Sequence, residues 1–412
     1  MDDTATPLLL AQRLIACSSI TPARGEVFDC LQAMLEPLGF AVHRTLDGVP
    51  AATTNADTST TGTSIIGPDT IGLSTIGANA AEAPVENLLA IRDGPPGSRH
   101  FAFAGHLDVV PAGDGWHSDP FEPEIRGDLL YGRGAVDMKG AIAAMVAAVA
   151  RVPQDAGTIS FIITGDEEGP ARHGTLALMQ HMAARGVRPD LCLVGEPTSV
   201  HRLGDTMKIG RRGSVNIFLE VCGTQGHVAY PQLADNPVPR LVAMLAQLEA
   251  LVLDDGTDWF QPSNLEITDI YVGNPAHNVI PAMAQARISI RFNDRHTGAQ
   301  LGSRVMQIAQ RHGGTARPVI SGEPFLTRPG HFSSLLAAAI REETGQEAEL
   351  STSGGTSDAR FLNALCPVIE FGLCNATMHK RDEAVAIADL DTLASIYRRT
   401  VVAALLHRDE QE

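Results

Sequence analysis

The segment FIITGDEEG, residues 161–169, ends an apolar, strand-like run in three consecutive acids, Asp166, Glu167 and Glu168. Carboxylates this close together repel one another and raise each other's pKa values unless a cation or a proton lies among them. A solvated turn would explain an isolated Asp-Glu-Glu sequence. A metal site would explain it as well, but such a site needs further ligands elsewhere in the chain.

Potential ligands stand in four other segments. GHLDVVP contains His106 and Asp108, whose side chains point to one side of an extended chain because strand side chains alternate. His106 can bind a metal through one ring nitrogen while Asp108 fixes the other. Three further motifs supply one candidate each: YGRGAVDMKG has Asp137, VGEPTS has Glu196 and NATMHKRDE has His379.

Each candidate also has an ordinary structural explanation. A single His-x-Asp on a strand is more often structural, Asp137 could cap the following helix, and a Gly-Glu-Pro turn is common. The set is informative because every acid follows an apolar strand or opens a helix. That placement puts all of them at one edge of a sheet, where independent structural roles would have to coincide.

Imidazole and carboxylate ligands without thiolate suit zinc, cobalt or manganese and suit calcium poorly. The candidate ligands are too many for one tetrahedral ion with an open position. They suffice for two ions that share a bridging carboxylate, about 3.5–4 Å apart as in two-metal hydrolases. They are His106, Asp137, Glu168, Glu196 and His379.

The elements that must position these residues alternate along the chain. Strand-like and helical segments follow one another in α/β order: 87–92, 100–110, 140–152, 158–164, 174–186 and 189–197. This order predicts an α/β fold with a mixed, largely parallel sheet flanked by helices, and ligands beyond the strand carboxyl ends.

Near residue 211 the pattern changes to antiparallel-type strands with two helices, and the α/β pattern resumes at about 321. We therefore expect an outer domain of residues 1–210 and 321–412 and an inserted α+β domain of residues 211–320. Residues 45–86 are rich in Ser, Thr, Gly and Ala, which predicts a flexible surface insertion.

Composition excludes several classes of protein. The formal charge of −17 over 412 residues argues against general nucleic-acid binding, which needs a basic surface. The six cysteines form no CxxC motif, and the N-terminus resembles neither a signal peptide nor a membrane span. We expect a cytoplasmic protein with no membrane partner.

The ordered motifs GHLDVVP, GRGAVDMKG, DEEG and VGEPTS resemble the co-catalytic zinc amidohydrolases and exopeptidases, a family that includes acetylornithine deacetylase and aminoacylase. The resemblance implies two Zn²⁺ ions per subunit, with Co²⁺ or Mn²⁺ able to substitute at one site. His106 and Glu196 would bind one ion, Glu168 and His379 the other, and Asp137 would bridge them. The family also has a cis peptide after this aspartate.

The same resemblance makes Glu168 a ligand and its neighbour Glu167 the general acid/base. Glu167 would take a proton from the attacking water, whose pKa zinc lowers toward about 7, and return it to the leaving amine. Asp108 would support His106.

A second group of motifs narrows the resemblance to one branch of the family, whose substrate carries several carboxylates and one amide to be cut. The motifs are GRRGS, QGHVAYP, DNPV, NVIP, GGTSDARF and NATMHK, so only residues 45–86 are left uncovered. Arg211 and Arg291 match carboxylate binders, a role for which arginine is suited. The other matching substrate contacts are Ser214, Tyr230, Asn278, Thr356 and Asn375.

His227 matches a histidine that the inserted domain of one subunit lends to its partner's site, where it stabilises the oxyanion. The resemblance therefore implies a homodimer joined through the inserted domains and a lid that closes for activity.

The chain departs from the family pattern at Leu107, Ala359 and in the run HKRDE, but none of these changes removes a ligand. An acetylornithine deacetylase-like deacylase or a dipeptidase is the near alternative. A catalytically silent binding or scaffold protein is a different one, and it would be expected if Glu167 or a ligand were missing.

Overall fold

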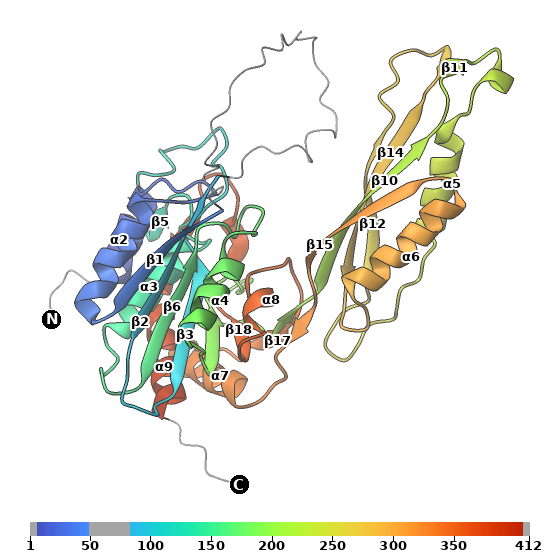
Figure 1. Cartoon of the computed structure of the whole chain (residues 1–412). Coiled ribbons are helices and arrows are strands. Elements are labelled where there is room, and N and C mark those ends of the chain that lie inside the picture. The colour runs from blue at the N-terminus through green and yellow to red at the C-terminus, as the bar shows by residue number, and fades with distance from the viewer. Residues whose placement is uncertain (1–5, 49–82, 407–412) are drawn as a thin grey trace, which may run out of the picture.

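An eight-stranded sheet lies between two layers of helices, with strand order β1-β2-β6-β3-β7-β18-β8-β17 (Figure 1). β3 runs parallel to both β6 and β7, and β7 runs parallel to β18, so these strands end at the same edge. The predicted mixed α/β sheet is confirmed. The strands are β1 (Ala41–Asp47), β2 (Val85–Arg92), β3 (His100–His106), β6 (Thr158–Thr164), β7 (Leu191–Val194), β8 (Thr206–Lys208), β17 (Glu349–Ser351) and β18 (Val368–Glu370).

The computed structural model describes residues 6–48 and 83–406. The predicted insertion at 45–86 therefore lies mostly outside the described residues. Its ends are corrected, because residues 45–47 and 85–86 belong to the antiparallel pair β1–β2, in which Asp47 stands opposite Val85. Backbone hydrogen bonds between the two strands fix these ends, which composition alone had assigned to the loop.

Helices cover both faces of this sheet and enclose two hydrophobic clusters. One face carries α1 (Pro7–Ala16), α2 (Glu26–Leu35), α3 (Lys139–Val149), α7 (His331–Thr344) and α9 (Ile387–Leu406). The other carries α4 (Thr175–Ala184) and α8 (Ala359–Leu362). The sheet is therefore buried on both sides, as expected for parallel strands.

Helix α3 is buried on every side, and its sequence explains why. Its alanines and Gly140 let neighbouring elements approach closely, and a Cβ at Gly140 would lie 2.3 Å from the carbonyl oxygen of Ala135. Tight packing here fixes the segment that precedes the helix and carries Asp137. Among the described helices, none is both long and apolar enough to cross a bilayer.

A second sheet, antiparallel with order β12-β14-β10-β15, extends away from the first (Figure 1). Its strands bury alternate residues against two helices, which gives this region its own hydrophobic cluster. The elements are β10 (Gly213–Cys222), α5 (Pro237–Glu249), β12 (Asn264–Tyr271), β14 (Met283–Phe292), α6 (Gly298–Arg311) and β15 (Thr315–Gly322).

Short elements complete the described chain. They are β4 (Glu124–Arg126), β5 (Leu129–Tyr131), β9 (Gly210–Arg211), β11 (Gly226–His227), β13 (Val279–Ile280), β16 (Phe325–Leu326), β19 (Ala384–Ala386), and the 3-10 helices η2 (Glu36–Leu38), η4 (Pro231–Leu233) and η5 (Asn375–Thr377). β9 pairs with β16 where the chain passes between the two sheets. The division of the chain into two domains at residues 211 and 320 stays our proposal. We place the boundary between these domains at the β9–β16 pair.

Candidate metal centre

The predicted ligands lie together at the carboxyl edge of the central parallel strands. His106 is the last residue of β3, Glu167 and Glu168 follow β6, and Glu196 follows β7. Because these three strands are parallel neighbours, each one delivers its following residues to the same place.

Asp137 lies between the two histidines. Its Oδ1 is 3.2 Å from His106 Nε2, and its Oδ2 is 3.1 Å from His379 Nε2. The same His379 nitrogen is 2.8 Å from Glu168 Oε1, whereas His106 Nε2 is 3.8 Å from Glu196 Oε1. One carboxylate therefore presents an oxygen to each side, with a histidine and a glutamate on each, as a bridging ligand would. The peptide bond Asp137–Met138 is cis.

The role predicted for Asp108 needs a correction. His106 Nδ1 lies 2.9 Å from the backbone oxygen of Asp108 and 3.6 Å from its carboxylate, so the carbonyl group holds the ring. The strand ends at His106, and the side-chain alternation on which the prediction rested stops there. The Asp108 carboxylate instead accepts the backbone N–H groups of Glu167 and Glu168, at 3.2 and 2.9 Å. The carboxylate thus supports the acidic pair, and it also lies within ion-pair distance of the imidazole.

The site holds more carboxylates than its histidines can balance. Burial and the nearby Asp137 raise the pKa of Glu196 to about 8, and burial together with Glu196 raises the pKa of Glu167 well above its usual range. Hydrogen bonds to Asp137 and Glu168 raise the pKa of His379 to about 10. Burial is the larger cause for the two glutamates, and neighbouring carboxylates contribute to all three shifts. A divalent cation would offset this negative charge.

Two observations show that these residues suit bound metal ions. The Oε1 atom of Glu196 is buried and has no hydrogen-bond partner within the described part of the chain. Ligand atoms lie within 4.8 Å of one another in two groups, His106 with Asp137 and Glu168, and His106 with Glu167 and Glu196. The nitrogen and oxygen donors suit zinc or a similar ion. Glu167, like Glu168, has a carboxylate oxygen within 4.8 Å of other potential ligand atoms.

A cavity of about 680 Å³ opens beside the acidic pair. Glu167 and Glu168 form part of its wall, and Thr356, a predicted substrate contact, forms another part. Residues 319–321 of β15, the last strand of the second sheet, also line it. The cavity therefore lies between the metal centre and the root of the second sheet, where a bound substrate would reach both.

Arg211 is engaged in a way that the sequence did not predict. Its guanidinium is buried and binds Glu370, with Nε at 3.0 and 2.9 Å from the two carboxylate oxygens. Its NH1 group also donates to the carbonyl of Gly355 at 3.2 Å, next to Thr356. In this structure Arg211 therefore holds the loop of residues 353–357, and its role as a substrate carboxylate binder stays a prediction.

Ser214 and Arg291 stand opposite each other on β10 and β14, at the root of the second sheet. Ser214 Oγ is buried without a hydrogen-bond partner among the described residues. Burial, with Arg212 close by, lowers the pKa of Arg291. This excess of positive charge suits an anionic group. Asn375 lies in η5, on the segment that also bears His379, and its backbone N–H donates to Ser199 O at 3.0 Å.

His227, Tyr230 and Asn278 form a separate group. The rings of His227 and Tyr230 have centroids 5.8 Å apart, and Val228 N donates to Asn278 O at 3.1 Å. All three are exposed, and they lie around β11 at the end of the second sheet that is remote from the first (Figure 1). Within one chain, the structure does not bring this group to the metal centre.

Two buried glutamates near the site were missed by the sequence analysis. Glu370 ends the apolar strand β18, the same signal that identified Glu196. Glu383 gave no such signal, because it stands in a charged run rather than at a strand end.

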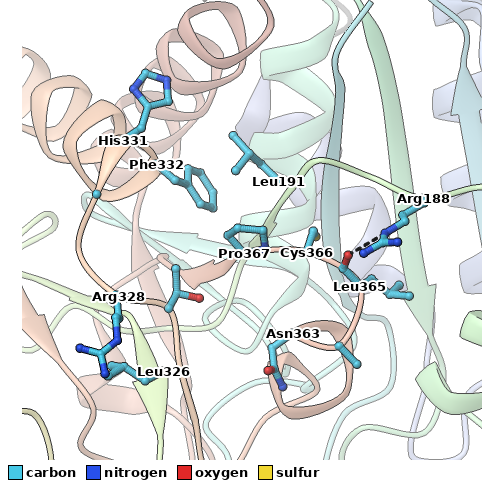
Figure 2. A pocket seen from close by; sticks show the side chains of 13 residues that line it. Arg188, Leu191, Leu326, Arg328, His331, Phe332, Asn363, Leu365, Cys366 and Pro367 are labelled. Atoms are coloured by element: carbon cyan, nitrogen blue, oxygen red, sulfur yellow. Dashed lines mark hydrogen bonds between the residues drawn. The ribbon is translucent and has the colours of Figure 1, made fainter. Parts of the chain in front are cut away.

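A second cavity lies at the opposite end of β7 and β18 and is lined by Leu191, Phe332 and Pro367 among others (Figure 2). Arg188, Arg328 and His331 lie apart from one another around it, and Arg188 Nε donates to the carbonyl of Leu365 at 3.1 Å. Among the described residues that line this cavity, the charged side chains do not converge on one point.

The model of a family described as Peptidase family M20/M25/M40 matches residues 102–403. Two curated relatives are named succinyl-diaminopimelate desuccinylase. The protein of Erythrobacter litoralis is 69% identical over 395 residues, covering 96% of this chain and 98% of the relative. That of Novosphingobium aromaticivorans is 67% identical over 399 residues, covering 97% and 98%.

A solved structure with a similar fold is that of an M20 family metallo-carboxypeptidase from Sulfolobus solfataricus. Its TM-score is 0.71 at 14% identity, with 99% of this chain and 100% of that chain covered. At this identity the likeness concerns the fold alone.

Proposed function

The chain belongs to peptidase family M20/M25/M40, and we infer that it is a succinyl-diaminopimelate desuccinylase. It hydrolyses N-succinyl-L,L-2,6-diaminopimelate to succinate and L,L-diaminopimelate, a step toward lysine and cell-wall diaminopimelate. The observation that carries the chemistry is the Asp137 carboxylate with one oxygen toward each histidine. The substrate rests on relatives that are 69 and 67% identical over nearly their whole length.

We propose a dinuclear zinc centre, with Co²⁺ or Mn²⁺ able to replace zinc at one site. His106 and Glu196 would hold one ion, Glu168 and His379 the other, and Asp137 both. Zinc would supply the positive charge that polarises the amide carbonyl and lowers the pKa of water.

Glu167 performs the proton transfers in this proposal. Its carboxylate accepts a proton from the attacking water as the water oxygen bonds to the amide carbon, and it donates a proton to the nitrogen as the C–N bond breaks. Asp108 keeps Glu167 in place through the backbone. Ser214 and Arg291, which pair at the root of the second sheet, would bind a substrate carboxylate. The other contacts would be Arg211, Thr356 and Asn375.

His227, Tyr230 and Asn278 serve the neighbouring subunit in the homodimer that we propose. Their position at the remote end of the second sheet supports this assignment (Figure 1). His227 would donate a hydrogen bond to the oxyanion that develops on the amide oxygen.

Hydrolysis of succinyl-diaminopimelate and of acetylornithine by the purified, zinc-loaded protein tests the substrate. We expect kcat/KM for the succinylated substrate to be at least about 100-fold higher than for acetylornithine. Charged groups of the site that pair with the succinylated substrate would be left unpaired when a substrate without those carboxylates binds. Chelator-treated protein is the control and should hydrolyse neither compound. Equal rates, or faster cleavage of acetylornithine, would replace the proposed substrate with that of a related deacylase.

A further inference from the structure

Glu383 is fully buried and binds a single short segment through both carboxylate oxygens. Oε1 accepts the backbone N–H groups of Val136 and Asp137 at 2.8 and 3.0 Å. Oε2 accepts the N–H of Gly134 at 2.9 Å and NH1 of Arg133 at 2.8 Å. The carboxylate therefore holds the loop 133–137 from a point 246 residues away in the sequence.

Among the described residues, only Glu383 accepts the backbone N–H groups of Gly134, Val136 and Asp137. The loop connects β5 to α3, every residue of it is buried, and it has neither helical nor strand hydrogen bonding. A buried N–H group without an acceptor destabilises the fold, so the loop depends on an acceptor at this place. The residue that the carboxylate fixes at the end of the loop is Asp137.

Glu383 is also joined firmly to His379. Thr377 Oγ1 donates to the carbonyl oxygen of Ala384 at 2.9 Å and accepts the N–H of Ala384 at 3.1 Å. These two hydrogen bonds close the turn that contains both His379 and Glu383. β19, which begins at Ala384, pairs with β5, the strand before the loop. His379 and the carboxylate of Glu383 therefore belong to one unit.

We propose that Glu383 is a positioning residue of the metal centre, which holds Asp137 and His379 at the separation that one metal ion requires. The inference rests on the proposed dinuclear site. It predicts that the binding affinities of the two ions depend on Glu383 to different degrees. The ion between Asp137, Glu168 and His379 has two ligands that Glu383 positions, whereas the ion at His106 and Glu196 shares only Asp137.

The test is zinc binding to metal-free Glu383→Gln, measured by competition with a chromophoric chelator. Glutamine keeps the size of the side chain but presents an NH₂ group to donors on one side. We expect one of two zinc equivalents to bind about 10–100-fold more weakly, a typical effect of losing a group that orients ligands. The other equivalent should stay within about threefold of wild type. The visible spectrum of the Co²⁺-loaded variant should change for the weaker site alone.

Asp254→Asn is the matched control. Asp254 is a carboxylate of the inserted domain with a side chain 3% exposed, and it accepts hydrogen bonds from Gly256 N, Asn293 Nδ2 and His296 Nε2. Its replacement should lower the melting temperature without changing either zinc affinity. Should Glu383→Gln not fold, Glu383→Asp, which withdraws the carboxylate by one methylene, is expected to weaken the same equivalent.

Unchanged binding of both ions by a folded Glu383 variant would overturn the inference and leave Glu383 with a role in folding only. Equal weakening of both ions would contradict it as well. Failure of the wild-type protein to bind two ions is a different result, because it would refute the proposed metal centre itself.

Discussion

Replacement of Glu167 by alanine should lower kcat by about 10²–10⁴-fold, the usual contribution of a general acid/base, while both metal ions stay bound. Glu167 has no part in holding either ion in our proposal. Its neighbour Glu168 does, since its carboxylate is 2.8 Å from His379 Nε2. The measurement is steady-state hydrolysis of succinyl-diaminopimelate together with metal analysis of the same sample.

Glu168→Ala is the comparison for this experiment, because the two glutamates are adjacent and both face the cavity. It should lose one equivalent of zinc as well as activity. The comparison is needed because Glu167 also lies within 4.8 Å of ligand atoms on His106 and Glu196. Its position alone therefore does not distinguish a metal ligand from a general acid/base. If Glu167→Ala lost a metal ion and Glu168→Ala kept both, the two roles would be exchanged.

Replacement of His227 by alanine should lower kcat by about 10²–10³-fold, as removal of one oxyanion-stabilising donor does. Zinc content and melting temperature should not change, because His227 is exposed and its Nδ1 accepts a local hydrogen bond from Ala229 N in the same turn. Loss of metal from this variant would contradict the assignment, since the chain's own His227 lies far from its own metal centre (Figure 1).

Mixed dimers test whether the site is shared between subunits. A dimer of one His227→Ala subunit and one Glu167→Ala subunit should contain one complete site, made of the first subunit's metal centre and the second subunit's His227. Its matched control carries both substitutions in one subunit beside a wild-type partner, and there neither site is complete. Activity in the control but not in the first dimer would show that each chain acts alone.

The sequence predicted that the candidate ligands lie together at one edge of the sheet, because its signals are local. A strand that ends in an acid or a histidine places that residue at the sheet edge, and the parallel order of β3, β6 and β7 follows from the α/β alternation. His106, Glu168 and Glu196 were found in this way. The relation of Asp137 to its two histidines required the resemblance to a known family.

Interactions over long sequence separations could not be predicted. The pair of Arg211 and Glu370 joins residues 159 positions apart. Nothing in the sequence indicated that Arg211 would be paired with a carboxylate of the same chain. Glu383 acts on backbone N–H groups, which have no sequence signature at all. The sequence did not predict that the Asp108 carboxylate holds the backbone of Glu167 and Glu168, because β3 ends at His106 and the side-chain alternation stops there.

Anomalous diffraction from zinc-soaked crystals, recorded on both sides of the zinc absorption edge, tests the central claim most directly. The account predicts two anomalous peaks about 3.5–4 Å apart, one on each side of the Asp137 carboxylate. One of them should adjoin His106 and Glu196, and the other Glu168 and His379. No peak at saturating zinc, or peaks away from Asp137, would contradict the dinuclear hydrolase.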